Sequence, residues 1–221
     1  IKVLEKERTT LKSFIKEIRD YQLLKNILIF FPFLLAHKLN AESITASFLA
    51  FLSFSFCASF VYILNDLLDL ESDRQHPRKC KRPLASGAVP IQLSIFIAPV
   101  LLLSGLAVGL FLLPLEYFYT LVAYLILTTT YSFYLKKLII LDTIILSSLY
   151  TIRLIAGAFA VQVIISPWLL GFSIFFFLSL AVIKRYTELR VMLENNKQKP
   201  DGRGYKTDDI SFLRTIGTAS G

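Results

Sequence analysis

Residues 62–87 read YILNDLLDLESDRQHPRKCKRPLASG and follow directly on a hydrophobic run. Asn65, Asp69 and Asp73 are spaced i, i+4, i+8 in this stretch, which places their side chains on one face of a helix. Their oxygen atoms are hard ligands that suit Mg²⁺, an ion that shares its shell with water and substrate phosphates. The stretch therefore predicts a site that holds a divalent cation and a diphosphate at a membrane boundary. The alternative is an acidic helix end that only faces water, although that arrangement opposes the helix dipole.

A basic segment surrounds the expected end of this helix. Proline disfavours helical geometry in the residue before it, so the pair His76-Pro77 predicts that the helix stops here. Arg74, Lys79 and Arg82 flank this break, and an arginine can offer two parallel hydrogen bonds to a phosphate. We therefore predict that this loop folds back over the bound phosphates.

The composition of the chain indicates a membrane protein. Of its 221 residues 55% are hydrophobic, and its mean hydropathy is +0.61. A soluble domain is nearer about 45–50% apolar, and a membrane-spanning helix needs about 20 predominantly apolar residues. Several uncharged runs reach that length, and Ser166-Pro167 divides the last of them into two. We predict six full spans, at residues 22–38, 44–64, 91–113, 116–135, 139–161 and 166–184.

The distribution of basic residues predicts how these spans are oriented. Lys and Arg cluster in residues 2–25, 74–82, 136–137 and 184–206. When six spans are threaded, these segments fall on one side of the membrane, and an excess of positive charge marks the cytoplasmic side. We therefore expect an integral protein of the inner (plasma) membrane with cytoplasmic site loops. The same rule offers an alternative account of the net charge of +8, because many of these residues could serve only to orient the helices.

The two ends of the sequence also carry expectations. Residues 1–20 alternate charged and apolar side chains, which is typical of an amphipathic helix on a membrane surface or of a connection to another domain. The last residues, FLRTIGTASG, look like the start of a seventh span. Because the sequence also begins at Ile1, we expect it to be an excerpt of a longer protein.

A second group of candidate site residues lies around the fifth expected span. Lys136 is in the loop before it, Asp142 is near its start, and Arg153 follows within it. Arg153 lies about 16 Å deeper than Asp142 at a rise of 1.5 Å per residue. A guanidinium at that depth is costly unless it lines a polar cavity or has a partner. We predict an anion-binding cavity, with an internal ion pair as the alternative.

Basic residues also stand where two other spans meet the cytoplasm. Lys184 and Arg185 begin KRYTELR at the end of the sixth span, and Lys25 lies at the entry to the first. Basic side chains at helix ends often serve only as interface anchors. The alternative, which we prefer for Lys184, is that they bind a phosphate in the cytoplasmic mouth of the bundle.

These motifs resemble those of a known family. NDLLDLESD resembles the N-D-x-x-D-x-x-x-D motif of the UbiA prenyltransferase superfamily. DRQHPRKCKRPLASG, YSFYLKK…D…RLIAGA and FLSLAVIKRYTEL follow in the same order, so the resemblance covers most of the chain. It implies an all-α polytopic transmembrane bundle with a central cavity capped by cytoplasmic loops. Residues 21–221 would form this domain, incomplete at its C-terminus, with six full spans and the start of a seventh.

One branch of the superfamily fits the sequence best. Typical aromatic prenyltransferases have a second motif, D-x-x-x-D, after the sixth span, and the loop that begins KRYTELR lacks it. Lys136, Arg153 and the pair Lys184-Arg185 resemble instead the decaprenyl-phosphate phosphoribosyltransferase branch. Members of that branch move phosphoribose from phosphoribosyl pyrophosphate to a polyprenyl phosphate. Both substrates are anionic, which agrees with a cavity rich in Lys and Arg.

The resemblance also implies roles for individual residues. Asn65, Asp69 and Asp73 would bind Mg²⁺, and a lipid-phosphate oxygen would displace pyrophosphate at the anomeric carbon of the sugar. Asp69 and Asp73, through the metal ion, and Arg153 directly would stabilise the negative charge on the departing pyrophosphate. The residues implied in substrate binding are Lys25, Tyr62, Lys79, Arg82, Lys136 and Arg153 for the diphosphate donor, and Lys184 and Arg185 for the polyprenyl acceptor. No nucleic-acid partner is expected, and some relatives carry a phosphatase domain before this one.

Three alternatives stay open from the sequence. A prenyl diphosphate could be moved onto an aromatic acceptor, although this reaction would need a second acidic site. A transporter could place Arg153 in a substrate path, although paired repeats with broken helices, which are common in transporters, are not found. A noncatalytic lipid-binding scaffold would leave the carboxylate spacing without an explanation.

Overall fold

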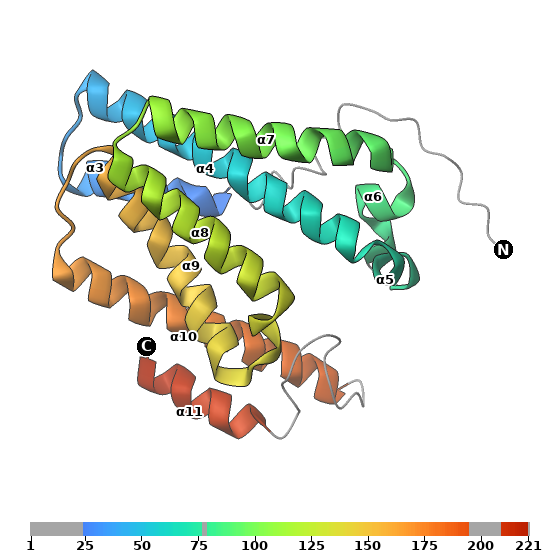
Figure 1. Cartoon of the computed structure of the whole chain (residues 1–221). Helices are drawn as coiled ribbons and strands as arrows, with labels where there is room; N and C mark the ends of the chain where they lie inside the picture. Colours follow the sequence, from blue (N-terminus) through green and yellow to red (C-terminus); the bar gives the residue numbers. More distant parts are fainter. Residues whose placement is uncertain (1–23, 77–78, 195–208, 221) are drawn as a thin grey trace.

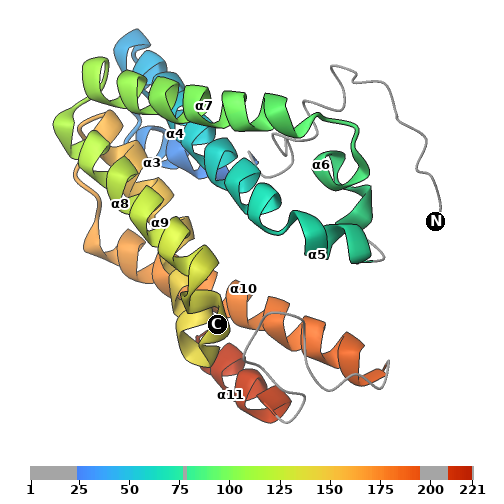
Figure 2. The same cartoon turned by 45° about the vertical axis from the view of Figure 1, so that its right-hand side comes forward.

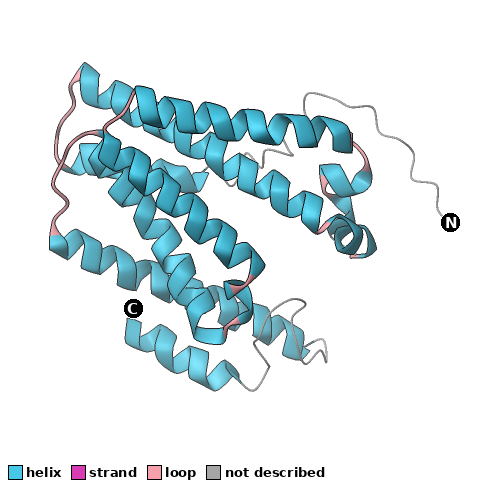
Figure 3. Ribbon diagram, viewed as in Figure 1, coloured by secondary structure: helices cyan, strands magenta, loops and turns pink. Residues whose placement is uncertain are grey.

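The part of the chain that the structure describes consists of helices joined by loops. The structure is a computed structural model that describes residues 24–76, 79–194 and 209–220. In these ranges helices are the only regular elements (Figure 3), which confirms the predicted all-α fold. The surface helix expected over residues 1–20 lies outside the described residues. The elements, with η for a 3₁₀ helix, are η1 (Leu24–Phe30), α3 (Phe31–Leu35), α4 (Ala41–Leu68), α5 (Leu70–Gln75), η2 (Lys79–Lys81), α6 (Pro83–Ser86), α7 (Ile91–Phe111), α8 (Leu115–Phe133), η3 (Leu135–Lys137), α9 (Ile139–Ala160), α10 (Pro167–Glu194) and α11 (Ile210–Ser220).

Four of these helices, α4, α7, α9 and α10, are long and apolar enough to cross a membrane. They correspond to the second, third, fifth and sixth predicted spans. The fourth predicted span forms α8, which is not among the four, and the first is a shorter apolar helix, Leu24–Leu35. The predicted number of six full spans is therefore not confirmed. Two helices also run past their predicted ends, α4 to Leu68 and α10 to Glu194, because polar residues continue a helix after its apolar run has ended.

Proline and asparagine set several helix boundaries. Pro90 and Pro114 directly precede α7 and α8, and Pro167 is the first residue of α10. A proline suits a helix start because its ring presets φ and the missing N–H would have no partner there. Asn40 caps α4, where its Oδ1 accepts a hydrogen bond of 2.9 Å from the Ser43 amide. The break between the fifth and sixth predicted spans lies at Ser166-Pro167 as expected.

The helices form a bundle with α8 and α9 in the middle. Figures 1 and 2 show α4 and α7 side by side along the upper part, with α10 and α11 along the lower part. In α4 and α9, 56% and 61% of the most apolar window is buried, compared with 22% in α7 and 28% in α10. Of these four helices, α4 and α9 are therefore the more deeply buried and contribute most to the core. The outer helices leave large apolar side chains exposed, as a lipid-facing surface requires.

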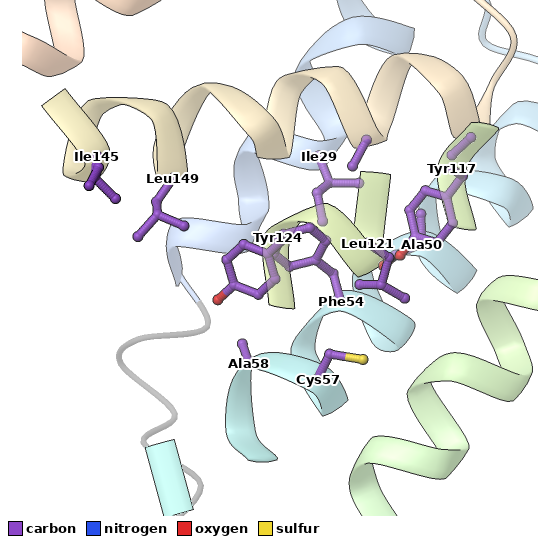
Figure 4. Close-up of a cluster of buried hydrophobic side chains, with 12 residues drawn as sticks. Ile29, Ala50, Phe54, Cys57, Ala58, Tyr117, Leu121, Tyr124, Ile145 and Leu149 are labelled. Carbon is purple, nitrogen blue, oxygen red and sulfur yellow. The ribbon is translucent and has the colours of Figure 1, made fainter. Parts of the chain in front are cut away.

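The main hydrophobic cluster joins η1, α4, α8 and α9 (Figure 4). The rings of Phe54 on α4 and Tyr124 on α8 lie 4.2 Å apart, measured between centroids. The Tyr117 hydroxyl donates a hydrogen bond of 2.8 Å to the Ala50 carbonyl, so this buried polar group is satisfied. The cluster fixes the mutual positions of the helices that surround the site described next.

Small residues allow two close backbone approaches in the bundle. The Ser53 hydroxyl of α4 donates a hydrogen bond of 2.7 Å to the Gly105 carbonyl of α7. At Gly157 on α9, an added Cβ would lie 2.9 Å from the Ile29 carbonyl carbon and still closer to its oxygen. Packing of backbones at glycine is common between membrane helices. Through Gly157, the 3₁₀ helix η1 lies directly against α9.

Candidate active site

A cavity of about 310 Å³ gathers many of the predicted site residues. It lies among η1, α4, α8, α9 and α10, and aromatic, hydroxyl and basic side chains line it. The predicted residues on its wall are Lys25, Tyr62, Asn65, Arg153, Lys184 and Arg185. The predicted residues Asp69, Asp73, Lys79, Arg82 and Lys136 are not among its lining residues. A larger cavity of about 570 Å³ lies at the other end of the bundle, around Lys38 and Gln162, and contains none of the predicted residues.

Arg153 is a buried cation held by neutral groups. Its side chain is 4% exposed, and its Nε donates a hydrogen bond of 2.9 Å to Oδ1 of Asn26. Its Nη1 donates to the Leu149 carbonyl, and its Nη2 lies 3.4 Å from the Tyr124 hydroxyl. Among the described residues no carboxylate lies within ion-pair distance of Arg153, so the alternative of an internal ion pair is not what the structure contains.

Three aromatic rings surround the Arg153 guanidinium. Its Cζ lies 5.1 Å from the ring centroid of Tyr124, 5.4 Å from that of Phe54 and 5.6 Å from that of Tyr150. The Lys25 Nζ lies 5.6 Å from the same Tyr150 ring. Aromatic faces attract a cation without cancelling its charge. Among the described residues the Arg153 guanidinium therefore keeps its positive charge beside the cavity, and the Lys25 ammonium lies near the same ring.

Arg185 lies on the same wall in a different electrostatic setting. It is 2% exposed, and its Nε and Nη2 donate to the two carboxylate oxygens of Asp142, the second at 3.1 Å. Its Nη1 donates a hydrogen bond of 2.8 Å to Glu188. The Tyr131 hydroxyl donates to Oδ1 of Asp142 at 2.8 Å. Asp142 therefore neutralises Arg185. The buried ion pair in this cavity involves Arg185, whereas the sequence offered such a pair as the alternative for Arg153.

The polar residues at the end of α4 and in α5 lie in two different environments, the cavity wall and an ion-pair cluster. Asn65 lines the cavity, where its Nδ2 donates a hydrogen bond of 3.1 Å to the Ser132 hydroxyl. Asp73 is 1% exposed and accepts a hydrogen bond from Arg82, which also donates to Asp66 at 2.9 Å. Between them the helix is interrupted at half-buried Asp69, which ends α4 and precedes α5. Backbone hydrogen bonds from the Asp69 amide to the Asn65 carbonyl and from the Asp73 amide to the Asp69 carbonyl continue across this interruption, at 2.9 Å and 2.8 Å. That the three side chains share one face stays a prediction.

Arg82 and Lys79 fold back toward this acidic end. The predicted contact of this loop with bound phosphates stays a prediction. Arg82 is the residue before α6 and bridges the carboxylates of Asp66 and Asp73. Lys79 Nζ lies 3.7 Å from Oδ1 of Asp73 and is 41% exposed. Lys136 is half-buried in η3 between α8 and α9. Arg82 and Lys79 therefore lie next to protein carboxylates, and Lys136 is not among the residues that line the cavity.

The donor atoms at the acidic end fit a magnesium ion. Asn65, Asp69 and Asp73 present amide and carboxylate oxygens, which are the ligands that Mg²⁺ takes. Oδ1 of Asp73 is buried and has no hydrogen-bond donor. Within residues 24–76, 79–194 and 209–220 no group of three or more His, Cys, Asp or Glu side chains could hold a metal ion by itself. A site here would therefore depend on an amide and on substrate oxygens in addition to carboxylates.

Two residues that shape this region were given no role by reasoning from the sequence. Asn26 accepts a hydrogen bond from Arg153, and Asp66 shares Arg82 with Asp73. Asp142, which belongs to the second predicted group, pairs with Arg185. Asp66 had a detectable signal, since side chains seven residues apart differ by only about 20° around a helix of 3.6 residues per turn. Asn26 had no such signal, because its partner is 127 positions away.

Comparisons with known proteins agree with this architecture. The sequence model of the UbiA prenyltransferase family matches residues 26–194. The chain is 35% identical to the uncharacterized protein y4nM of Sinorhizobium fredii, over 100% of this chain and 43% of that protein. It is 37% identical to decaprenyl-phosphate phosphoribosyltransferase of Mycobacterium tuberculosis, over 80% of this chain and 60% of that protein. The chain thus spans less than two thirds of either relative.

A solved structure shares the fold. The UbiA homolog from Archaeoglobus fulgidus, bound to DMAPP and Mg²⁺, matches with a TM-score of 0.70 and 16% sequence identity. The match covers 94% of this chain and 75% of that one. At this identity the likeness concerns the arrangement of the helices alone.

Proposed function

Because the chain belongs to the UbiA prenyltransferase family, we propose that its protein is a magnesium-dependent membrane transferase that displaces pyrophosphate. Its donor is phosphoribosyl pyrophosphate, and its acceptor is a polyprenyl phosphate. The observation that carries the proposal is the cavity wall on which Lys25, Arg153 and Lys184 meet, with Arg153 held by neutral partners. Two anionic substrates need such an excess of positive charge. The relative from Mycobacterium tuberculosis, which is named for phosphoribosyl transfer to decaprenyl phosphate, supports the same choice.

The cavity residues divide between the two substrates. Arg153 and Lys25 bind the pyrophosphate of the donor, with the Tyr62 hydroxyl beside them. Lys184, near the cytoplasmic end of α10, binds the phosphate of the lipid acceptor. Arg185 shapes this wall, while Asp142 carries its opposing charge. Since a phosphate oxygen is already anionic, the attack on the anomeric carbon requires no strong general base.

Asn65, Asp69 and Asp73 would hold a magnesium ion, which would supply neutralising charge for the leaving pyrophosphate. Lys79 and Arg82 stand next to these carboxylates and reduce the negative charge that faces the departing group. Fixed positive charge close to a developing anion lowers the barrier most where water is excluded. The apolar helices around the cavity provide that exclusion. The loops at this end are cytoplasmic in the plasma membrane, as the distribution of Lys and Arg indicates.

A labelled donor tests this function. The intact protein is purified in detergent with MgCl₂, a polyprenyl phosphate and radiolabelled phosphoribosyl pyrophosphate, and label is counted in the organic phase. The wild type is expected to make labelled lipid. Asp69→Ala is expected to lose at least about 100-fold in initial rate, equivalent to about 2.7 kcal/mol of barrier. The matched control is Glu42→Ala, which removes an exposed carboxylate at the opposite end of α4 and should keep the rate.

The same experiment separates the alternative donor. Two solved structural neighbours contain DMAPP or GPP with Mg²⁺, so a prenyl diphosphate is a reasonable second donor for this fold. Product from a prenyl diphosphate and an aromatic acid, with none from phosphoribosyl pyrophosphate, would move the protein to the aromatic branch. Labelled lipid that survives in Asp69→Ala would contradict the metal role of the acidic end.

A further inference from the structure

Two buried arginines line the cavity, and their hydrogen-bond partners differ in charge. Arg185 is 2% exposed and is paired with the carboxylates of Asp142 and Glu188. Arg153 is 4% exposed and is paired with an amide, a backbone carbonyl and aromatic groups. Within the described part of the chain, the positive charge of Arg185 is therefore cancelled locally, and that of Arg153 is not. A buried guanidinium without a counter-ion attracts whichever anion can reach it.

Asn26 is the residue that makes this difference. It is 1% exposed on η1, and its two amide atoms are used in different directions. Its Nδ2 donates a hydrogen bond of 3.0 Å to the Ser55 hydroxyl on α4, which turns Oδ1 toward Arg153 on α9. The amide oxygen accepts from the guanidinium Nε but carries no net charge. A chain of hydrogen bonds from Ser55 through Asn26 thus orients Arg153 and leaves its charge in place.

The packing around Asn26 makes this arrangement rigid. Ile29, one turn further along η1, is fully buried, and its backbone lies directly against Gly157 of α9. Gly157 and Arg153 are one turn apart on the same helix. The contact therefore holds η1 at the distance that the hydrogen bond from Arg153 to Asn26 needs.

We propose that Asn26 is a positioning residue that holds Arg153 without neutralising it, and thereby sets the affinity of the cavity for a phosphoryl anion. The inference rests on the proposed function, because the anion is the pyrophosphate part of the donor. A carboxylate in the place of the amide would keep the hydrogen bond and the shape of the side chain. It would also cancel the charge of Arg153, and at short range in a poorly solvated site that loss is large. The amide at this position is thus required chiefly because it is neutral.

The test measures pyrophosphate binding to the intact protein in detergent with MgCl₂, by calorimetry, together with the thermal unfolding midpoint. Asn26→Asp changes the charge at nearly constant shape, and Asn26→Ser keeps the site neutral with a shorter hydrogen-bonding group. We expect N26D to unfold no earlier than the wild type and to bind pyrophosphate at least tenfold more weakly, about 1.4 kcal/mol. We expect N26S to stay within about threefold of the wild-type affinity, about 0.65 kcal/mol. In the transfer assay, the effect of N26D should appear mainly as a higher KM for the donor.

The outcomes separate this inference from the proposed function. A wild type that binds neither pyrophosphate nor phosphoribosyl pyrophosphate would remove the proposed function itself. A wild type that binds, with a folded N26D that binds equally well, would overturn only the role of Asn26. Equal losses in N26D and N26S would also overturn it, since the hydrogen bond rather than the charge would then matter. If N26D does not fold, N26S decides, because a tenfold loss in that neutral variant contradicts the inference and retained affinity supports it.

Discussion

Asp142 supplies the negative charge that makes burial of Arg185 tolerable. Its side chain is 0% exposed and accepts from two nitrogens of Arg185 and from the Tyr131 hydroxyl. If this carboxylate is removed, Arg185 stays in the interior with only the partly exposed Glu188 as an opposite charge. Removal of one partner of a buried ion pair typically costs about 3–5 kcal/mol. We expect Asp142→Ala to lower the thermal unfolding midpoint of the detergent-purified protein strongly.

Glu188→Ala provides the control for this prediction. Glu188 also binds Arg185, at 2.8 Å, but it is 33% exposed and stands three residues away on the same helix. An ion pair of this kind contributes about 0–1 kcal/mol because water screens it. Its loss should hardly change the midpoint. Equal shifts in the two variants would show that Asp142 is not the principal partner of Arg185.

The close approach of the η1 backbone to α9 requires a residue without a side chain at position 157. A Cβ on Gly157 would overlap the backbone of Ile29, which cannot move aside as a flexible side chain can. Overpacking in a dense core typically costs about 1–3 kcal/mol. We therefore expect Gly157→Ala to lower the thermal midpoint, and also to weaken pyrophosphate binding because η1 carries Asn26 and Lys25.

Gly171 on α10 is the matched helical control. A Cβ added there would have no atom within 4 Å. Alanine is favoured over glycine in a helix by about 0.5–1 kcal/mol, so Gly171→Ala should leave the midpoint unchanged or raise it. If Gly157→Ala were as stable as Gly171→Ala, the close approach of η1 to α9 would be refuted.

At the scale of the whole molecule, the two cysteines report on orientation. Cys57 is buried in the core, and Cys80 is half-buried on η2, in the basic loop of residues 74–82. If the basic loops are cytoplasmic, a membrane-impermeant maleimide should label Cys80 in inside-out vesicles and not in intact cells. The readout is the mass shift of the protein or its loss after Cys80→Ser.

A cysteine at the opposite end of the bundle completes this measurement. Lys38 is exposed, and its Nζ donates a hydrogen bond of 3.3 Å to the Gln162 carbonyl, at the end where α3, α4 and α9 meet loops. Lys38→Cys in a Cys80→Ser background should be labelled in intact cells and protected in inside-out vesicles. Labelling of Cys80 from outside would reverse the proposed orientation.

Local patterns along the chain were enough to predict the helical architecture and the family. Apolar runs located the long helices, and prolines located their starts, because both act through neighbours along the chain. The pair His76-Pro77 correctly predicted that α5 stops at Gln75. The positions of Lys25, Arg153 and Lys184 within or at the ends of predicted spans, together with the family resemblance, made them candidates, and all three line one cavity.

Which of the two buried arginines pairs with a carboxylate depends on how the helices pack against one another. Arg153 and Arg185 look alike in the sequence, and the carboxylate of Asp142 lies closer to Arg153 along the chain, yet it pairs with Arg185. The partner of Arg153 is Asn26, on an element 127 positions away. Helix periodicity describes which side chains share a face of one helix, and it carries no information on which faces of different helices meet. Those meetings depend on packing at residues such as Gly157, where the space available is a property of the folded bundle alone.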